Sequence, residues 1–150
     1  MISKLTSLTE SQTIEFKQIW KDEYLKTICA FANSDGGILY IGITDDGRVV
    51  DLDNLKSLIE ILPNKINNRL GLLVDMLSEV IESKEVIKIK VDKTYAPISY
   101  NGKFYKRSGS NTIELNGSNL TNFLLKKYGK TWDKSIIMNF KCLILNEKIA

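Results

Sequence analysis

The chain has 150 residues, of which 43% are hydrophobic and 26% charged, a composition typical of one globular domain. It contains no histidine, and its two cysteines, Cys29 and Cys142, lie far apart. A structural zinc site and every mechanism that needs an imidazole base are therefore excluded. No apolar run reaches the roughly 20 residues that span a bilayer, and the first residues lack the apolar core of a signal peptide, so we expect a cytoplasmic protein without a membrane partner.

The net charge of +3 hides an asymmetry between the two halves of the chain. Residues 1–80 carry 8 Lys/Arg and 12 Asp/Glu, a balance of −4, whereas residues 81–150 carry 13 and 6, a balance of +7. This split favours an anionic partner for the C-terminal half, with nucleic acid first and a membrane surface second. A solvated lysine-rich surface would give the same charge, so the charge alone does not decide between them.

The first half of the chain predicts two parallel strands joined by a helix. Residues 13–17 alternate as a strand that buries Ile14 and Phe16 and exposes Glu15 and Lys17 on the other face. Residues 22–33 have the spacing of a helix, which the sequence NSDGG ends, and residues 38–43 are apolar on both faces, as in a central strand. Since a helix joins the two strands, we expect them to be parallel and to end along the same edge of the sheet.

The second half predicts hairpins and two more helices. Residues 52–68 have helical spacing with a kink or an early end at Pro63, and residues 85–91 alternate as a strand that we expect to pair with residues 72–83. Asn101-Gly102 predicts a two-residue hairpin turn with positive φ. A last helix is expected over residues 118–128, capped by Ser118 and ended by Gly129.

These elements predict an α+β fold, a mixed β-sheet with flanking helices. We expect one domain over residues 1–130. Residues 131–150 are expected to form a C-terminal helical extension that begins a truncated downstream region.

Four patches of the sequence, taken in order, resemble a known family. They are residues 10–17, residues 30–47 (AFANSDGGILYIGITDDG), Pro97 and residues 104–112 (FYKRSGSNT). Together they closely resemble the Schlafen AlbA-like domain of the AlbA-2 type, formerly catalogued as a divergent AAA domain. The resemblance implies an AlbA-like lobe that binds DNA or RNA, commonly at the N-terminus of bacterial proteins regarded as transcriptional regulators or helicase-like. No Gly-x4-Gly-Lys-Ser/Thr occurs in the sequence, which argues against ATP hydrolysis.

The leading hypothesis is a nucleic-acid-binding module whose phosphate contacts are basic or hydroxyl side chains. Exposed backbone N–H groups beside two cations make the Lys106 to Ser110 loop suited to a phosphate, although a polar loop that happens to be basic explains it equally well. The candidate residues are Lys17, Lys103, Lys106, Arg107, Ser108, Ser110, Lys126, Lys127 and Lys130.

The rival hypothesis is a metal-dependent endoribonuclease of the Schlafen type. Glu10, Glu15 and Asp45, or Asp46 in place of Asp45, match the three carboxylates of the nuclease relatives and would hold Mg²⁺ or Mn²⁺. Five extended residues span about 16 Å, so Glu10 reaches Glu15 only if the chain bends back between them. Clustered carboxylates favour the enzyme, and separated ones favour binding alone.

A third hypothesis is a dimerisation or scaffolding domain without a ligand.

The nuclease relatives build a clamp from two related lobes. This chain has one lobe and would have to form a homodimer to imitate it.

Overall fold

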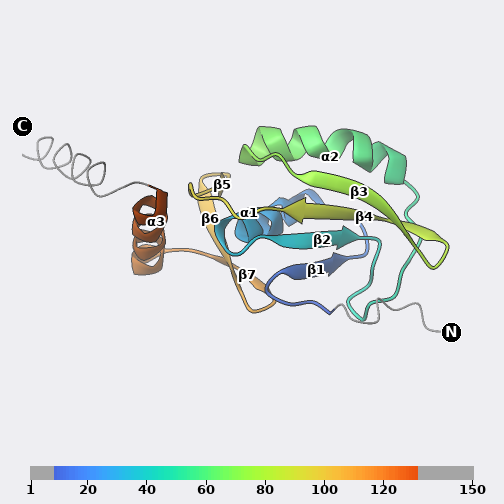
Figure 1. Cartoon of the computed structure of the whole chain (residues 1–150), viewed down its shortest axis with the longest axis horizontal. Helices are drawn as coiled ribbons and strands as arrows, with labels where there is room; N and C mark the ends of the chain where they lie inside the picture. The colour runs from blue at the N-terminus through green and yellow to red at the C-terminus, as the bar shows by residue number, and fades with distance from the viewer. Residues whose placement is uncertain (1–8, 132–150) are drawn as a thin grey trace, which may run out of the picture.

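The computed structural model describes residues 9–131 and contains two β-sheets with helices around them (Figure 1). The larger sheet has the strand order β1 (Ile14–Lys17), β2 (Gly37–Ile41), β4 (Lys84–Val91) and β3 (Asp75–Ile81). β1 and β2 are parallel neighbours and the other pairs are antiparallel, so the predicted mixed sheet is confirmed. The β3–β4 hairpin is also confirmed.

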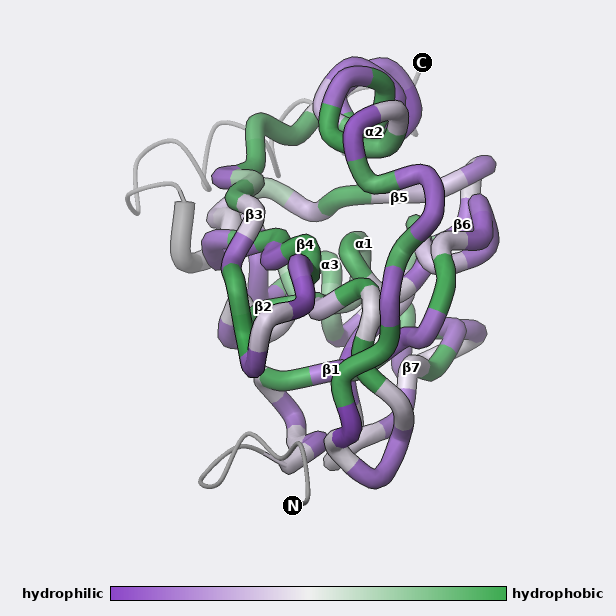
Figure 2. Tube along the Cα trace, turned by 90° about the vertical axis from the view of Figure 1, so that its right-hand side faces the viewer, coloured by the Kyte–Doolittle hydropathy of each residue, from purple (hydrophilic) through white to green (hydrophobic). Residues whose placement is uncertain are grey.

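The helices lie where the sequence predicts them. A short 3-10 helix, η1 (Asp22–Tyr24), leads into α1 (Leu25–Asn33), which packs against β2 and against the second sheet and is almost entirely buried. α2 (Leu55–Leu70) follows β2, and Figure 2 shows hydrophobic and hydrophilic residues alternating around its turns. It does not end at Pro63, because Leu62 and Ile66 on either side of the proline are completely buried. Their packing outweighs the hydrogen bond that the proline removes.

The second sheet is antiparallel and consists of β5 (Ser99–Tyr100), β6 (Lys103–Ser108) and β7 (Asn111–Glu114). The predicted turn between β5 and β6 is confirmed, with φ of 51° at Asn101 and 76° at Gly102. Side chains alternate along β6, so that Tyr105 and Arg107 are buried while Lys106 between them is exposed. The two faces of β6 therefore have different surroundings.

The last helix, α3 (Gly117–Thr131), stands at one end of the molecule, apart from the larger sheet (Figure 1). It includes Ser118 and continues through Gly129, so the predicted cap and stop are wrong. Gly129 does not have the positive φ of a helix end, and a glycine inside a helix costs only about 1 kcal/mol. Except for Thr131, the predicted extension over residues 131–150 lies outside the described residues. In residues 9–131 no helix is both long and apolar enough to cross a membrane.

Candidate nucleic-acid interface

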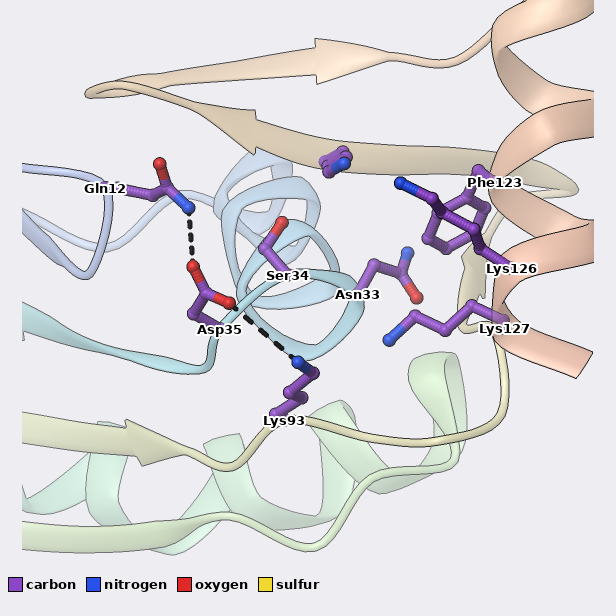
Figure 3. A pocket seen from close by; sticks show the side chains of 9 residues that line it. Gln12, Asn33, Ser34, Asp35, Lys93, Phe123, Lys126 and Lys127 are labelled. Carbon is purple, nitrogen blue, oxygen red and sulfur yellow. Dashed lines mark hydrogen bonds and ion pairs between the residues drawn. The ribbon is translucent and has the colours of Figure 1, made fainter. Parts of the chain in front are cut away.

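A cavity of about 170 Å³ lies where α3 meets the rest of the domain (Figure 3). We call it the lysine cleft, because four lysines line it and Asp35 is the one acidic residue in its lining. The lysines come from the loop after β4, from β6 and from α3. The lining residues are Gln12, Asn33, Ser34, Asp35, Lys93, Lys106, Phe123, Lys126 and Lys127.

Two side chains attach α3 to the rest of the domain at this cleft. Lys127 is buried and its Nζ donates a hydrogen bond to the carbonyl of Thr94 at 2.7 Å. The ring of Phe123 packs against that of Phe104, with ring centroids 6.3 Å apart. Lys127, which the sequence predicts as a phosphate contact, is therefore also part of the attachment of α3.

Lys106 and Lys126 face the cleft from β6 and α3 and are exposed. Within residues 9–131 neither amine has a hydrogen bond or an ion pair. Lys93 Nζ lies 3.9 Å from Asp35 Oδ1, and Gln12 Nε2 donates to Asp35 Oδ2 at 2.7 Å. Asp35 is thus already engaged, which leaves the amines of Lys106 and Lys126 available to an anion.

The floor of the cleft is held by the last residues of α1. The Asn33 amide donates to the carbonyls of Ile98 at 2.8 Å and Tyr105 at 2.9 Å, and its oxygen accepts the Ile98 N–H at 2.8 Å. Ser34 Oγ accepts the backbone N–H of Arg107 at 2.9 Å. These residues tie α1 to the second sheet, so their role in the cleft is to position the lysines.

The backbone conformation at residue 36, just after the residues on the floor of the cleft, requires a glycine. Its φ is +77°, and a Cβ added there would lie 2.8 Å from the carbonyl oxygen of Val91. Only glycine accommodates both the left-handed backbone and the close approach of the loop after β4. That close approach brings Lys93 to the cleft.

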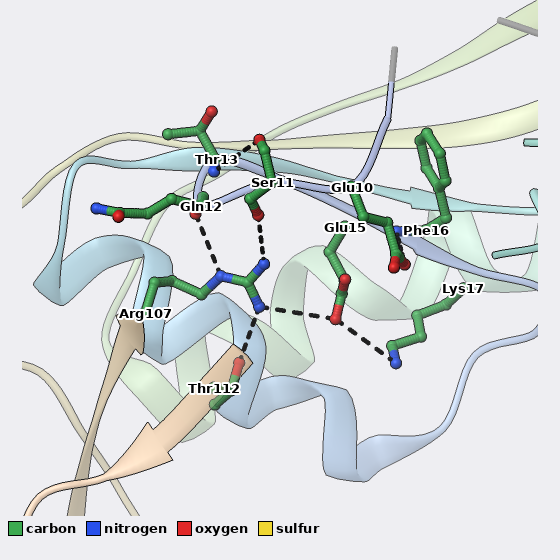
Figure 4. Close-up of polar contacts among 9 residues, drawn as sticks. All are labelled: Glu10, Ser11, Gln12, Thr13, Glu15, Phe16, Lys17, Arg107 and Thr112. Carbon is green, nitrogen blue, oxygen red and sulfur yellow. Dashed lines mark hydrogen bonds and ion pairs between the residues drawn. The ribbon is translucent and has the colours of Figure 1, made fainter. Parts of the chain in front are cut away.

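Arg107 lies inside the domain (Figure 4). Its side chain donates to the carbonyls of Ser11 at 2.7 Å and Gln12 at 3.2 Å and to Thr112 Oγ1 at 3.1 Å. Only 2% of the residue is exposed, so its predicted position at the surface is wrong. Alternation along a strand places Arg107 and Lys106 on opposite faces, but the sequence does not indicate which of the two faces inward.

The other predicted phosphate contacts do not line the cleft or lie outside the described residues. Lys103 is on the Arg107 side of β6 by strand alternation, and its Nζ lies 3.4 Å from Glu114 Oε1. Ser108 and Ser110 are exposed near the β6–β7 turn. The side chain of Lys130 lies outside the described part of the chain. Lys93, by contrast, was missed, since nothing in its local sequence marks it.

The chain bends back between Glu10 and Glu15, which is the condition for the two carboxylates to meet. Ser11 donates its N–H to the carbonyl of Ile14 at 2.8 Å, and the turn brings Glu10 back onto β1, where its carboxylate accepts the N–H of Phe16 at 3.1 Å. Burial raises the pKa of Glu15 to about 7, and a hydrogen bond with Glu10 and repulsion from its charge contribute to the same shift. Lys17 and Arg107 lower the pKa but do not cancel this effect. Glu15 is only 8% exposed, so its predicted place on an exposed strand face is wrong.

The third predicted carboxylate does not complete a metal site. Asp45 is exposed and lines a neighbouring polar hollow with Lys17, while Asp46 is bound by Thr44 and Arg48. Within residues 9–131 no three or more His, Cys, Asp or Glu side chains are grouped so that they could hold a metal ion. Two cations already face Glu15 Oε1, Lys17 Nζ at 3.7 Å and Arg107 Nη1 at 3.6 Å. The described residues therefore do not fit Mg²⁺ or Mn²⁺ at this position.

The family model described as "Schlafen, AlbA_2" matches residues 10–116. The chain belongs to this family. The match covers both sheets, α1 and α2, and it ends just before α3. No curated protein matches the sequence.

Solved structures that are similar to this chain include the following two. The DIP2311 protein from Corynebacterium diphtheriae has 23% identity and a TM-score of 0.58, over 70% of this chain and 25% of its own. The chain thus spans about a quarter of the length of that protein. Another is the N-terminal domain of the "Putative ATP-dependent DNA Helicase RecG-related Protein" from Nitrosomonas europaea. It has 26% identity and a TM-score of 0.55, over 75% of this chain and 89% of that domain.

Proposed function

We propose that this chain is a nucleic-acid-binding module that contacts phosphates through the lysine cleft. The observation that carries the proposal is the pair of exposed amines, Lys106 and Lys126, which face one cavity from two elements and have no partner in residues 9–131. Like charges gathered without a counterion repel each other, and a phosphate would relieve that repulsion. Family membership and the similarity to a domain of a RecG-related protein support the same function.

The experiment measures the affinity of the full chain for labelled oligonucleotides as a function of salt. Each phosphate charge neutralised by a lysine contributes about 0.7 to 0.9 to the slope of log K against log salt. We expect the triple variant Lys93→Gln, Lys106→Gln, Lys126→Gln to flatten the slope by about 2 to 3. The control carries Lys21→Gln, Lys56→Gln and Lys90→Gln, which remove three exposed lysines that do not line the cleft. Equal slopes for both variants would contradict the proposal.

A ribonuclease is the second candidate function, and the paired carboxylates of Glu10 and Glu15 favour it. With a pKa of about 7, Glu15 can both accept and give up a proton near neutral pH, which is what a general acid or base requires. The test is incubation of labelled RNA with the full chain, with and without Mn²⁺ or Mg²⁺, beside Glu15→Gln. Cleavage that Glu15→Gln abolishes would support the enzyme. Absence of cleavage would leave binding alone.

The position of the module in a bacterial transcriptional regulator is also a proposal. This role would require sequence-specific binding to duplex DNA, so it is the alternative to a module that prefers a single strand. Selection of duplexes from a random pool by the full chain tests it, because a regulator would enrich one sequence and a non-specific binder would enrich none.

A further inference from the structure

The lysine cleft is built only in part from the segment that the family model matches. That match ends at residue 116, yet Phe123, Lys126 and Lys127 of α3 line the cleft. A second hollow of about 690 Å³ adjoins it and shares Lys106, Phe123 and Lys126 with it. The residues that line the second hollow alone are Leu115, Asn119, Asn122 and Leu125. The two cavities meet at these shared residues of β6 and α3, and we call the pair of cavities the recess.

We propose that this recess binds a single unpaired strand of nucleic acid, with α3 as one wall of the site. A phosphate lies between Lys106 and Lys126, and the attached sugar and base lie in the second hollow. The inference rests on the proposed function and adds to it the class of nucleic acid and the part of the chain that recognises it.

The position of the two shared lysines favours a single strand. Lys106 and Lys126 stand at the junction of the two cavities, so a backbone that passes from one cavity to the other meets both amines. Proteins bind a duplex by placing a protruding helix or ribbon in a groove, or by spreading cations over an outer surface. Here the cations line a recess between two protein elements, the arrangement by which a positively charged groove follows one backbone.

The second hollow has the chemistry for a base and a sugar. Asn119 and Asn122 are exposed and lie three residues apart on α3, so their amides share one face of the helix. Each amide offers donors and an acceptor to a base edge. Leu125, which is 66% exposed, provides an apolar surface beside them. Phe123 is only 7% exposed, so it fixes α3 against Phe104 and leaves little ring for a base to stack on.

The experiment compares a labelled 12-nucleotide single strand with its own duplex, using the full chain and fluorescence anisotropy at several salt concentrations. Four proteins are measured besides the unchanged chain: Lys106→Gln, Lys126→Gln, the double variant Asn119→Ala with Asn122→Ala, and Lys56→Gln as the control. All of these positions are exposed, so the variants should fold, and circular dichroism checks that they do.

We expect the single strand to bind more tightly than the duplex. Lys106→Gln and Lys126→Gln should each weaken single-strand binding about two- to fivefold and flatten its salt slope by about 0.7. The asparagine variant should weaken binding with an unchanged slope, because it removes no charge. Lys56→Gln should match the unchanged chain.

Three results would overturn the inference. Equal or tighter binding of the duplex, with the same dependence on Lys106, would leave the proposed function standing and refute the single-strand site. An effect of Lys106→Gln without one of Lys126→Gln would remove α3 from the site. Absence of binding to either form would refute the proposed function as well.

Discussion

The pH dependence of stability should reveal the buried carboxylate of Glu15. Its pKa is about 7 in the folded protein against a usual value of 4.5, so the folded state binds the proton more tightly than the unfolded state. The stabilisation from this group is complete below about pH 4.5 and is lost as the pH rises through about 7. At 1.36 kcal/mol for each pH unit, the difference between the two pKa values corresponds to a loss of up to about 3 kcal/mol.

Glu15→Gln keeps the size of the side chain and removes its titration. We expect the free energy of unfolding of the unchanged chain to fall between pH 5 and pH 8 by more than that of the variant, with a difference of up to about 3 kcal/mol. Urea unfolding at pH 5, 6, 7 and 8 measures it. Glu60→Gln, an exposed position on α2, is the control and should follow the unchanged chain.

Parallel curves for the unchanged chain and Glu15→Gln would refute the reasoning. They would mean that the carboxylate stays ionised across this range, held by Arg107 and Lys17. Burial and the neighbouring Glu10 would then not be enough to raise the pKa of Glu15 against these two cations.

Three further predictions concern other residues. Gly36→Ala should lower the free energy of unfolding by more than about 2 kcal/mol in urea unfolding, because the added Cβ would meet the Val91 carbonyl. Gly71→Ala is the control, since Gly71 has a φ of +69° but nothing within 4 Å of an added Cβ, and it should cost about 1 kcal/mol. Arg107→Met should cost about 3 kcal/mol or more in the same assay, since it leaves the carbonyls of Ser11 and Gln12 and the Glu15 carboxylate without their partner; a loss of nucleic-acid binding without a loss of stability would contradict this. Lys103→Gln should leave oligonucleotide affinity unchanged in anisotropy titrations, because Lys103 lies on the other face of β6 from Lys106 and beside Glu114.

The sequence by itself determined the elements that depend on local chemistry. The strand at residues 13–17 is indicated by a pattern of neighbouring residues, although Glu15 on its polar face is buried. The positive φ that the turn at Asn101-Gly102 requires is local as well. The parallel pairing of β1 and β2 follows from the helix between them. The sequence also shows that Glu10 can meet Glu15 only if the chain bends between them, because five extended residues span a fixed length.

The tertiary structure decided which charged side chains face solvent and which meet. Lys106 and Arg107 are neighbours in the sequence, but packing of α1 against β6 buries one and leaves the other exposed. The docking of α3 places Lys126 beside Lys106, and the approach of the loop after β4 to Gly36 adds Lys93. These contacts join residues far apart in the chain. They depend on how whole elements pack, and no local pattern of residues records that packing.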